Sequence, residues 1–289
     1  MSDLERSTSP TLRSRSAGQT VMQKVLELQD NAPPRGRLAR ALGQSPLHPD
    51  AVSWYQGALG ELETGRRLAT LGAGYTVLHS LPIGGVGGGA DGGADGAAAV
   101  DADLESPSAV DHLVIGAAGV FCLNSTPSVT DAQRVAVAAE ARQVSKHLSR
   151  TLQRVVPVTP LLVTAGVTRA RLPRAASPSS DGASAATANV EVVPSRALAG
   201  WFVKRGPVLT TAELATLAFA AERPDTWRAP ASVDQPVLAV DFHQLQSEVN
   251  AATDRERAAL TIVVIVAVLV ALVSASVILS SLLPGFFWH

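Results

Sequence analysis

The sequence predicts an α/β domain followed by a single transmembrane helix. An amphipathic helical pattern precedes several short β-branched runs, and further helical patterns follow them, as in a sheet with flanking helices. Near the C-terminus, residues 258–283 form a run without charge or proline. The length of 289 residues leaves room for one domain of ordinary size plus appendages.

The first 50 residues predict a largely disordered tail. Ser, Thr, Pro and Arg are mixed there, and the prolines at 33 and 34 interrupt any helix. Residues 21–29 carry a short amphipathic pattern, which a partner-binding helix would also produce. The domain itself is expected to span residues 51–222.

The domain begins with a helix and a strand. Residues 54–71 have leucines at helical spacing and two arginines on the wet side, and residues 75–78 read as a strand. Residues 84–108 are rich in glycine and alanine, with acids interspersed. We interpret them as a flexible insertion rather than a calcium site, because only one partial copy of a calcium-binding repeat is present.

A β-hairpin follows, and it contains the first candidate site residue. Residues 110–115 and 120–123 are β-branched runs joined by a Gly-Ala-Ala-Gly connection. Asp111 stands near the start of the first run, where a core-facing position is normally apolar. A buried carboxylate is costly unless it is paired, protonated or bound to a metal.

A basic helix and a strand continue the domain. Residues 131–152 form a helical pattern with several arginines, for which phosphate binding and a solvated face are both open interpretations. Residues 155–163 predict a core strand, which Pro157 and Pro160 restrict to an irregular or edge position unless a bulge intervenes.

The last part of the domain predicts a second insertion, a short strand and two helices. The flexible insertion covers residues 174–189, and the strand covers residues 190–193. One helix is expected to begin at Ser195 and another at Thr210, where Glu213 completes a capping box.

Two short motifs lie on these predicted elements, the first in the opening helix and the second in the hairpin. The first is Gly57-Ala-Leu-Gly60-Glu61 in the opening helix, and the second is Asp111-His112 followed by Gly-Val-Phe in the hairpin. Together they resemble the nuclease-related domain (NERD) family, a branch of the restriction-endonuclease-like fold, over residues 52–222. The resemblance implies a small central mixed sheet with flanking helices.

The resemblance also implies where a catalytic centre would lie. Glu61 matches the family's helix glutamate and Asp111 its strand aspartate, and both would be metal ligands. The family's third strand ends in an acid, any residue, then lysine, whereas Asn124 and Thr126 stand at those positions here. The exchange removes one metal ligand and the lysine that stabilises charge on the attacked phosphate. We therefore expect no cofactor, with Mg²⁺ only if the domain is active.

Plainer interpretations of the same residues stay open. Glu61 would also suit a helix surface in the first turn, and Asp111 would suit a strand edge bonded to a neighbouring amide. His112 fits a hydrogen-bonded strand residue better than a metal ligand, because no second histidine stands at a ligand spacing.

The uncharged run at 258–283 predicts the membrane-spanning helix. At ~1.5 Å per residue, about 26 residues cover the ~30 Å hydrocarbon core. Residues 223–257 are the expected linker and juxtamembrane segment, and Arg255 and Arg257 mark the cytoplasmic flank. Residues 284–289 would then be a short extracytoplasmic tail.

Small residues in the span are compatible with helix pairing, and hence with a homo-oligomer. They are Ser274, Ala275, Ser276, Ser280 and Ser281. Serines that bond back to their own helix are the alternative.

Composition limits the function classes. With 24 basic and 25 acidic residues, net charge gives no argument for nucleic-acid binding, and 4% aromatic residues leave no base-stacking platform. The single cysteine, Cys122, cannot form an internal disulfide and fits a reducing compartment. No signal peptide is evident in the first 30 residues.

The sequence-based interpretation is a single-pass, tail-anchored protein of the cell membrane with a cytoplasmic N-terminal body. That body is expected to be a catalytically inactive, nuclease-like domain that binds nucleic acid or a protein partner. An active metal-dependent nuclease using Glu61 and Asp111 is one alternative, and a membrane-proximal structural adaptor is the other. Convergence of Glu61, Asp111 and Asn124 on one cleft would support an inherited site.

Overall fold

The computed structural model describes residues 12–33, 35–83, 109–165, 190–227 and 235–282. The chain divides into two compact units, residues 1–25 with 52–239 and residues 26–51 with 240–289. The predicted insertions at 84–108 and 174–189 and the tail at 284–289 lie outside the described residues.

The first unit contains a mixed five-stranded sheet with the order β1-β2-β3-β4-β5. The strands are β1 (Thr76–Pro82), β2 (Ala109–Gly116), β3 (Gly119–Thr126), β4 (Val158–Thr164) and β5 (Glu191–Pro194). β1, β2 and β3 are antiparallel, and β4 and β5 continue the sheet in parallel. The predicted hairpin is confirmed as β2–β3, and Gly119 at its turn has φ of 125°.

The first unit also contains helices that pack around this sheet, and the second unit consists of helical segments. They are η1 (Leu12–Ser14), α1 (Gln19–Gln29), α2 (Arg37–Ala41), α3 (Ala51–Leu68), α4 (Asp131–Leu152), η2 (Ser195–Ala197), α5 (Leu198–Val203), α6 (Thr211–Glu222), α7 (Pro224–Trp227) and α8 (Gln235–Leu282). The predicted helix at 131–152 is confirmed with the same bounds. The capping box of Thr210 and Glu213 is also confirmed, and it satisfies two amide groups at the start of α6.

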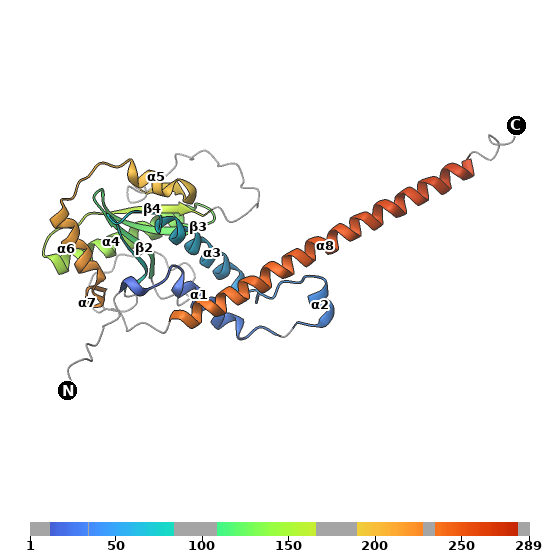
Figure 1. Cartoon of the computed structure of the whole chain (residues 1–289), viewed down its shortest axis with the longest axis horizontal. Coiled ribbons are helices and arrows are strands. Elements are labelled where there is room, and N and C mark those ends of the chain that lie inside the picture. The colour runs from blue at the N-terminus through green and yellow to red at the C-terminus, as the bar shows by residue number, and fades with distance from the viewer. Residues whose placement is uncertain (1–11, 34, 84–108, 166–189, 228–234, 283–289) are drawn as a thin grey trace. The chain divides into compact units, whose positions relative to one another are not determined.

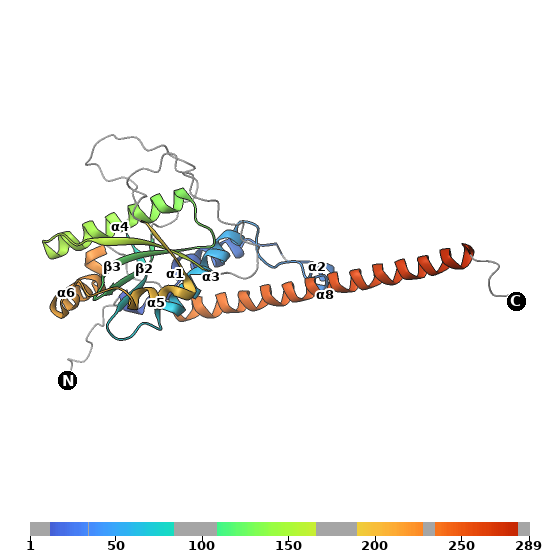
Figure 2. The same cartoon turned by 90° about the horizontal axis from the view of Figure 1, so that it is seen from above.

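The two faces of the sheet carry different helices (Figures 1 and 2). One apolar cluster joins strand residues such as Leu113 and Ile115 to Leu148 of α4 and Leu217 of α6. A second cluster joins the other face to α3 and α5, with Leu68, Phe121 and Phe202 among its members. The prediction of an α/β domain with flanking helices is therefore confirmed.

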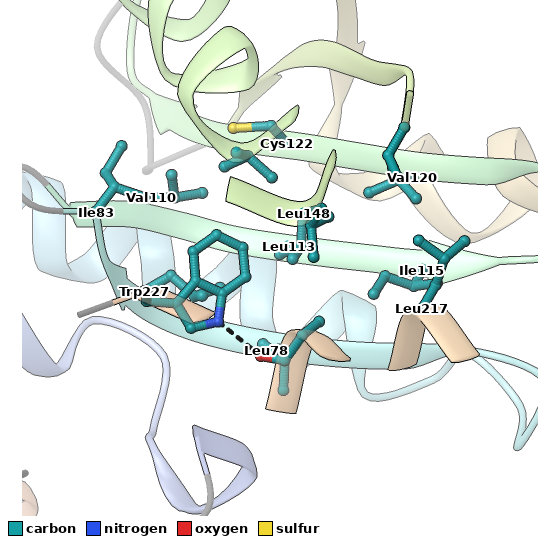
Figure 3. Close-up of a cluster of buried hydrophobic side chains, with 14 of the residues drawn as sticks. Leu78, Ile83, Val110, Leu113, Ile115, Val120, Cys122, Leu148, Leu217 and Trp227 are labelled. Carbon is teal, nitrogen blue, oxygen red and sulfur yellow. Dashed lines mark hydrogen bonds between the residues drawn. The ribbon is translucent and has the colours of Figure 1, made fainter. Parts of the chain in front are cut away.

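Trp227 packs within the first apolar cluster (Figure 3). Its side chain is fully buried, and its Nε1–H donates to the Ala221 carbonyl oxygen at 2.8 Å. The predicted linker from residue 223 thus begins with a helix that belongs to the core, because an indole buries a large apolar area when its N–H finds a partner.

Strand β4 corrects the prediction of an irregular or edge strand. It lies between β3 and β5, and Pro160 pairs in register with Cys122. The described part of β5 pairs only with residues 161–164, so Pro160 lies where β4 has a neighbour on one side. The missing amide of the proline therefore costs no bond to a second strand.

The N-terminal residues differ from the expected disordered tail. Leu12 belongs to the first apolar cluster, and Met22 and Val25 of α1 are buried. The backbone N–H of Gln19 donates to Ser80 Oγ on β1 at 3.1 Å, and Ser80 Oγ donates to the Ser16 carbonyl at 3.3 Å. These bonds tie the start of α1 to the sheet.

The second unit contains most of α8. Within this helix lies a segment that is long and apolar enough to cross a membrane by length and composition, with mean hydropathy of 3.0 and none of it buried. The prediction of one candidate membrane-spanning helix is confirmed at that level.

Candidate functional site

A cavity of about 190 Å³ lies in the first unit, where α1, α3 and α4 meet the β2 and β3 strands. Three predicted site residues line it together, namely Glu61, Asp111 and Asn124. The remaining lining residues are Thr20, Val21, Lys24, Trp54, Ser80, Ala109, Val110 and Glu140. The structure thus brings the strand and helix motifs to one place.

Glu61 reaches the cavity because it lies on the buried side of α3. The residue is 5% exposed, and it shares a helical stripe with Tyr55, Ala58 and Leu68, which are also buried. The sequence pattern predicted the apolar face from leucines that include residues 59 and 62. These two leucines are only half-buried. The buried stripe therefore includes an acid, and the plainer interpretation of Glu61 as a surface carboxylate is wrong.

Asp111 is held by the end of the neighbouring strand. Its Oδ2 accepts a hydrogen bond from the backbone N–H of Ser125 at 2.7 Å. Ser125 Oγ donates in turn to Thr64 Oγ1 on α3 at 2.8 Å. This chain of bonds joins the motif strand to the motif helix and positions the Asp111 carboxyl group.

Thr126 has a structural role at the position where the resemblance would place lysine. It is buried, its hydroxyl donates to the Ser128 carbonyl, and it accepts from Gln133 Nε2 at 2.6 Å. These bonds fix the junction between β3 and α4. Thr126 is not among the residues that line the cavity.

Glu140 is a third carboxylate at the cavity, and it was not among the predicted site residues. It comes from α4, and the Asn124 side chain hydrogen-bonds its carboxyl group. Glu140 stands three residues after Val137 and four before Val144, both fully buried. That helical spacing is a signal that would have found it.

Lys24 is a cationic residue at the same cavity and was missed as well. It lies on α1, the helix that the Ser80 bonds tie to the sheet. No local pattern in the sequence indicates that α1 meets the strands. Lys24 could be found only from the tertiary structure.

Burial changes the acid–base properties of all three carboxyl groups. It raises the pKa of Glu61 well above its usual range, and the charges of Asp111 and Glu140 add to the increase, while a backbone bond from Gly18 opposes it. Burial raises the pKa of Asp111 to about 7 against the effect of the Ser125 amide. Burial and the Asp111 charge raise the pKa of Glu140 to about 8, although the Asn124 bond lowers it.

The donor atoms at the cavity suit a hard divalent cation. The three carboxyl groups and the Asn124 side chain offer oxygen ligands, and buried Glu140 Oε2 and Asn124 Oδ1 have no hydrogen-bond partner among the described residues. Within the described part of the chain, no group of three or more His, Cys, Asp or Glu side chains is arranged to hold a metal. Mg²⁺ requires only one or two protein carboxylates, because waters and substrate phosphates complete its shell. The residues therefore fit Mg²⁺ bound in this way.

The histidine and cysteine near the motifs do not belong to this site. His112 Nδ1 lies 2.8 Å from His79 Nδ1, so the prediction of a hydrogen-bonded strand histidine is confirmed. Burial lowers the pKa of both imidazoles. Cys122 is a free, buried thiol whose pKa burial raises, which makes it a poor nucleophile.

An exposed basic stripe runs along α4. Arg142, Lys146 and Arg150 are exposed and follow one another at intervals of four residues. This spacing puts them on one side of the helix, with about 6 Å of axial rise between successive residues. Arg142 stands two positions after Glu140, so it lies about 3 Å further along the axis but on the opposite side of the helix from the Glu140 side chain.

No family model matches the chain, and no curated protein sequence or solved structure matches it either. The family resemblance therefore rests on the motifs and on the order of elements.

Proposed function

We propose that the first unit is a nuclease-like domain of the restriction-endonuclease-like class that hydrolyses nucleic acid with a divalent cation. One observation carries the proposal: Glu140 and Lys24 line the same cavity as Glu61 and Asp111. Glu140 supplies the acid that Asn124 lacks. Lys24 supplies the cationic group that Thr126 lacks.

The chain's own residues have separable roles in this proposal. Asp111 and Glu140 would hold the cation. Glu61, which lies on α3, would add to the negative charge around these two ligands. A bound Mg²⁺ would lower the pKa of a water molecule and neutralise charge on the phosphate. Lys24 would stabilise the negative charge of the phosphate that enters the cavity.

The stripe on α4 favours nucleic acid over a small phosphodiester. A polyanion can contact several aligned cations at once, and each such contact releases a counterion. Arg142, Lys146 and Arg150 provide this alignment although the net charge of the whole chain is −1. We further propose that α8 anchors the domain in the cell membrane, with the domain on the cytoplasmic side.

A second candidate is an inactive domain that binds nucleic acid or a protein partner. It is favoured by Thr126, whose hydroxyl is committed to the β3–α4 junction. It is also favoured by the fact that the described residues hold no ready-made group of three metal-binding side chains. The two candidates differ in whether cleavage accompanies binding.

The deciding experiment uses the full chain in lipid nanodiscs. Single- and double-stranded DNA and RNA are incubated with Mg²⁺ or Mn²⁺, and both cleavage and fluorescence anisotropy are measured. We expect cleavage that falls by about 100-fold or more in Asp111→Asn and Glu140→Gln. Asp131→Asn, on the exposed start of α4, is the matched control and should cleave normally.

Each other result has a defined meaning. Binding without cleavage would contradict hydrolysis and favour the inactive candidate. Neither binding nor cleavage would contradict both, and it would leave the adaptor as the remaining interpretation. Cleavage that persists unchanged in Asp111→Asn and Glu140→Gln would show that the activity arises elsewhere.

A further inference from the structure

The second unit contains a compact basic loop, residues 35–44, which we call the arginine loop. Its ends are joined, because Arg35 Nη1 donates to the Gln44 carbonyl at 2.8 Å. Backbone bonds from Leu42 to Leu38 and from Gln44 to Ala39 close it internally. The loop therefore has a defined shape although α2 inside it is only five residues long.

The arginine loop is attached to α8 at one level, and α2 lies beside α8 in both views (Figures 1 and 2). Gly43 has φ of 80°, and a Cβ there would stand 2.5 Å from the Ala252 carbonyl and overlap the backbone of Glu256. Arg35 also lies 3.6 Å from the Glu248 carboxylate. Two backbones can meet this closely only because residue 43 has no side chain.

This level coincides with the start of the apolar part of α8. Glu256 stands two residues before the predicted span at 258–283. From Leu260 to Val273, the large apolar side chains of the helix are exposed. The arginine loop thus lies beside the point where α8 would enter a bilayer.

The loop exposes both apolar and basic side chains. Leu38 is 72% exposed and Leu42 is 56% exposed. Arg37 and Arg40 are also exposed, and residues 35–44 contain three arginines and no acid. Exposed leucines beside arginines are typical of segments that lie in the interface of an anionic membrane.

We propose that the arginine loop lies on the membrane surface and binds anionic lipids. Leu38 and Leu42 enter the headgroup region, and Arg37 and Arg40 contact lipid phosphates. The loop lies next to the start of the apolar part of α8, and its arginines are complementary in charge to anionic lipids. Both observations indicate a lipid surface as the partner. The proposal rests on the membrane anchoring by α8 proposed above. It does not depend on hydrolysis of nucleic acid, because its test involves neither nucleic acid nor a divalent cation.

The test uses the full chain with an environment-sensitive fluorophore on Leu38→Cys, and on Leu42→Cys as a second site. Native Cys122 is fully buried and remains in place. The protein is placed in nanodiscs of phosphatidylcholine with or without phosphatidylserine, together with lipids that carry a spin-label quencher. We expect blue-shifted emission and quenching by the labelled lipid, with the larger effect when phosphatidylserine is present.

Two variants separate charge from position. Arg37→Gln with Arg40→Gln should remove the extra quenching in phosphatidylserine, whereas Arg66→Gln with Arg67→Gln on exposed sites of α3 should not. Gly43→Val keeps every charge but displaces the loop from α8, so it should also lose quenching. Water-like emission in every nanodisc would overturn the proposal. So would blue-shifted emission without lipid quenching, which would mean that a protein surface or a second copy covers the loop.

Discussion

The side-chain amide of Asn124 hydrogen-bonds the carboxyl group of Glu140, and so joins the end of β3 to α4 beside the cavity. Asn124 brings no charge to the site, whereas Glu140 does. In the proposed function, Glu140 takes the place of the acid that the resemblance implies at the end of the strand, and its partner Asn124 stands at that position.

Metal binding should depend on Glu140. We expect Glu140→Gln to weaken Mn²⁺ binding by about 10- to 100-fold, because the amide replaces a charged oxygen ligand. Isothermal titration of the full chain in nanodiscs measures the affinity, and Asp131→Asn on the same helix is the control. Asn124→Asp should bind Mn²⁺ more tightly than the natural chain, since it adds a carboxylate to the same cavity. Unchanged affinity in Glu140→Gln would exclude this residue as a ligand.

Stability should fall with rising pH because of the same carboxyl groups. In an unfolded chain Asp and Glu lose their protons near pH 4, whereas Asp111 and Glu140 in the folded chain retain them to about 7 and about 8. Between these limits the folded state holds protons that the unfolded state releases, so the free energy of unfolding decreases as pH rises.

The variant Glu140→Gln tests this linkage. It should raise the melting temperature at about pH 8.5 in the absence of metal and change it little at about pH 4. Mn²⁺ should stabilise the natural chain more at the higher pH, where the carboxylates are free to bind it. Equal pH slopes for Glu140→Gln and the natural chain would contradict the raised pKa of Glu140.

The fold was predictable where local patterns dominate. The helix at 131–152 has a capping residue, a long apolar period and a clear end, so its bounds match the structure. The hairpin β2–β3 follows from two β-branched runs around glycines. Strand β4 was placed wrongly because the cost of Pro160 depends on where β5 begins and ends, which is a tertiary property.

The site was predictable only in part. Glu61 and Asp111 were found from motifs, and their meeting at one cavity agrees with the order of those motifs. Glu140 was not among the predicted site residues, although its spacing from Val137 and Val144 places it on the buried side of α4. The position of Lys24 at the cavity depends on the contact of α1 with Ser80. No helical or strand period in the sequence encodes that contact.

Two glycines of α3 should respond in opposite ways to substitution. A Cβ at Gly65 would overlap the Cβ of Ala17, whereas one at Gly57 would stand 3.7 Å from Val21. We expect Gly65→Ala to destabilise the domain by about 1–3 kcal/mol through overpacking. Gly57→Ala should be neutral or stabilise by up to about 1 kcal/mol, because alanine favours the helix. Chemical denaturation measures both, and a stabilised Gly65→Ala would contradict the packing of residue 17 on α3.

Removal of residues 258–289 should release the protein into the soluble fraction. The apolar part of α8 is the one segment of the described chain long enough to span a bilayer. The arginine loop alone should hold the truncated chain only weakly and reversibly, since a short interfacial segment buries little apolar area. Fractionation followed by a high-salt wash measures the distribution. Stable retention of the truncated protein in membranes would reveal a second anchor.

The orientation in the membrane should place the first unit in the cytoplasm. Arg255 and Arg257 lie directly before the span, and residues 284–289 contain no lysine or arginine. The arginine loop adds basic residues on the same flank, while nearby acids count little in this rule. Cysteine labelling in intact cells tests the orientation, and buried Cys122 gives no background. A cysteine in place of His289 should react with a membrane-impermeant thiol reagent, whereas Val155→Cys, at a site 88% exposed, should react only after permeabilisation. The reverse pattern would put the cavity outside the cell, where it would not meet cytoplasmic nucleic acid.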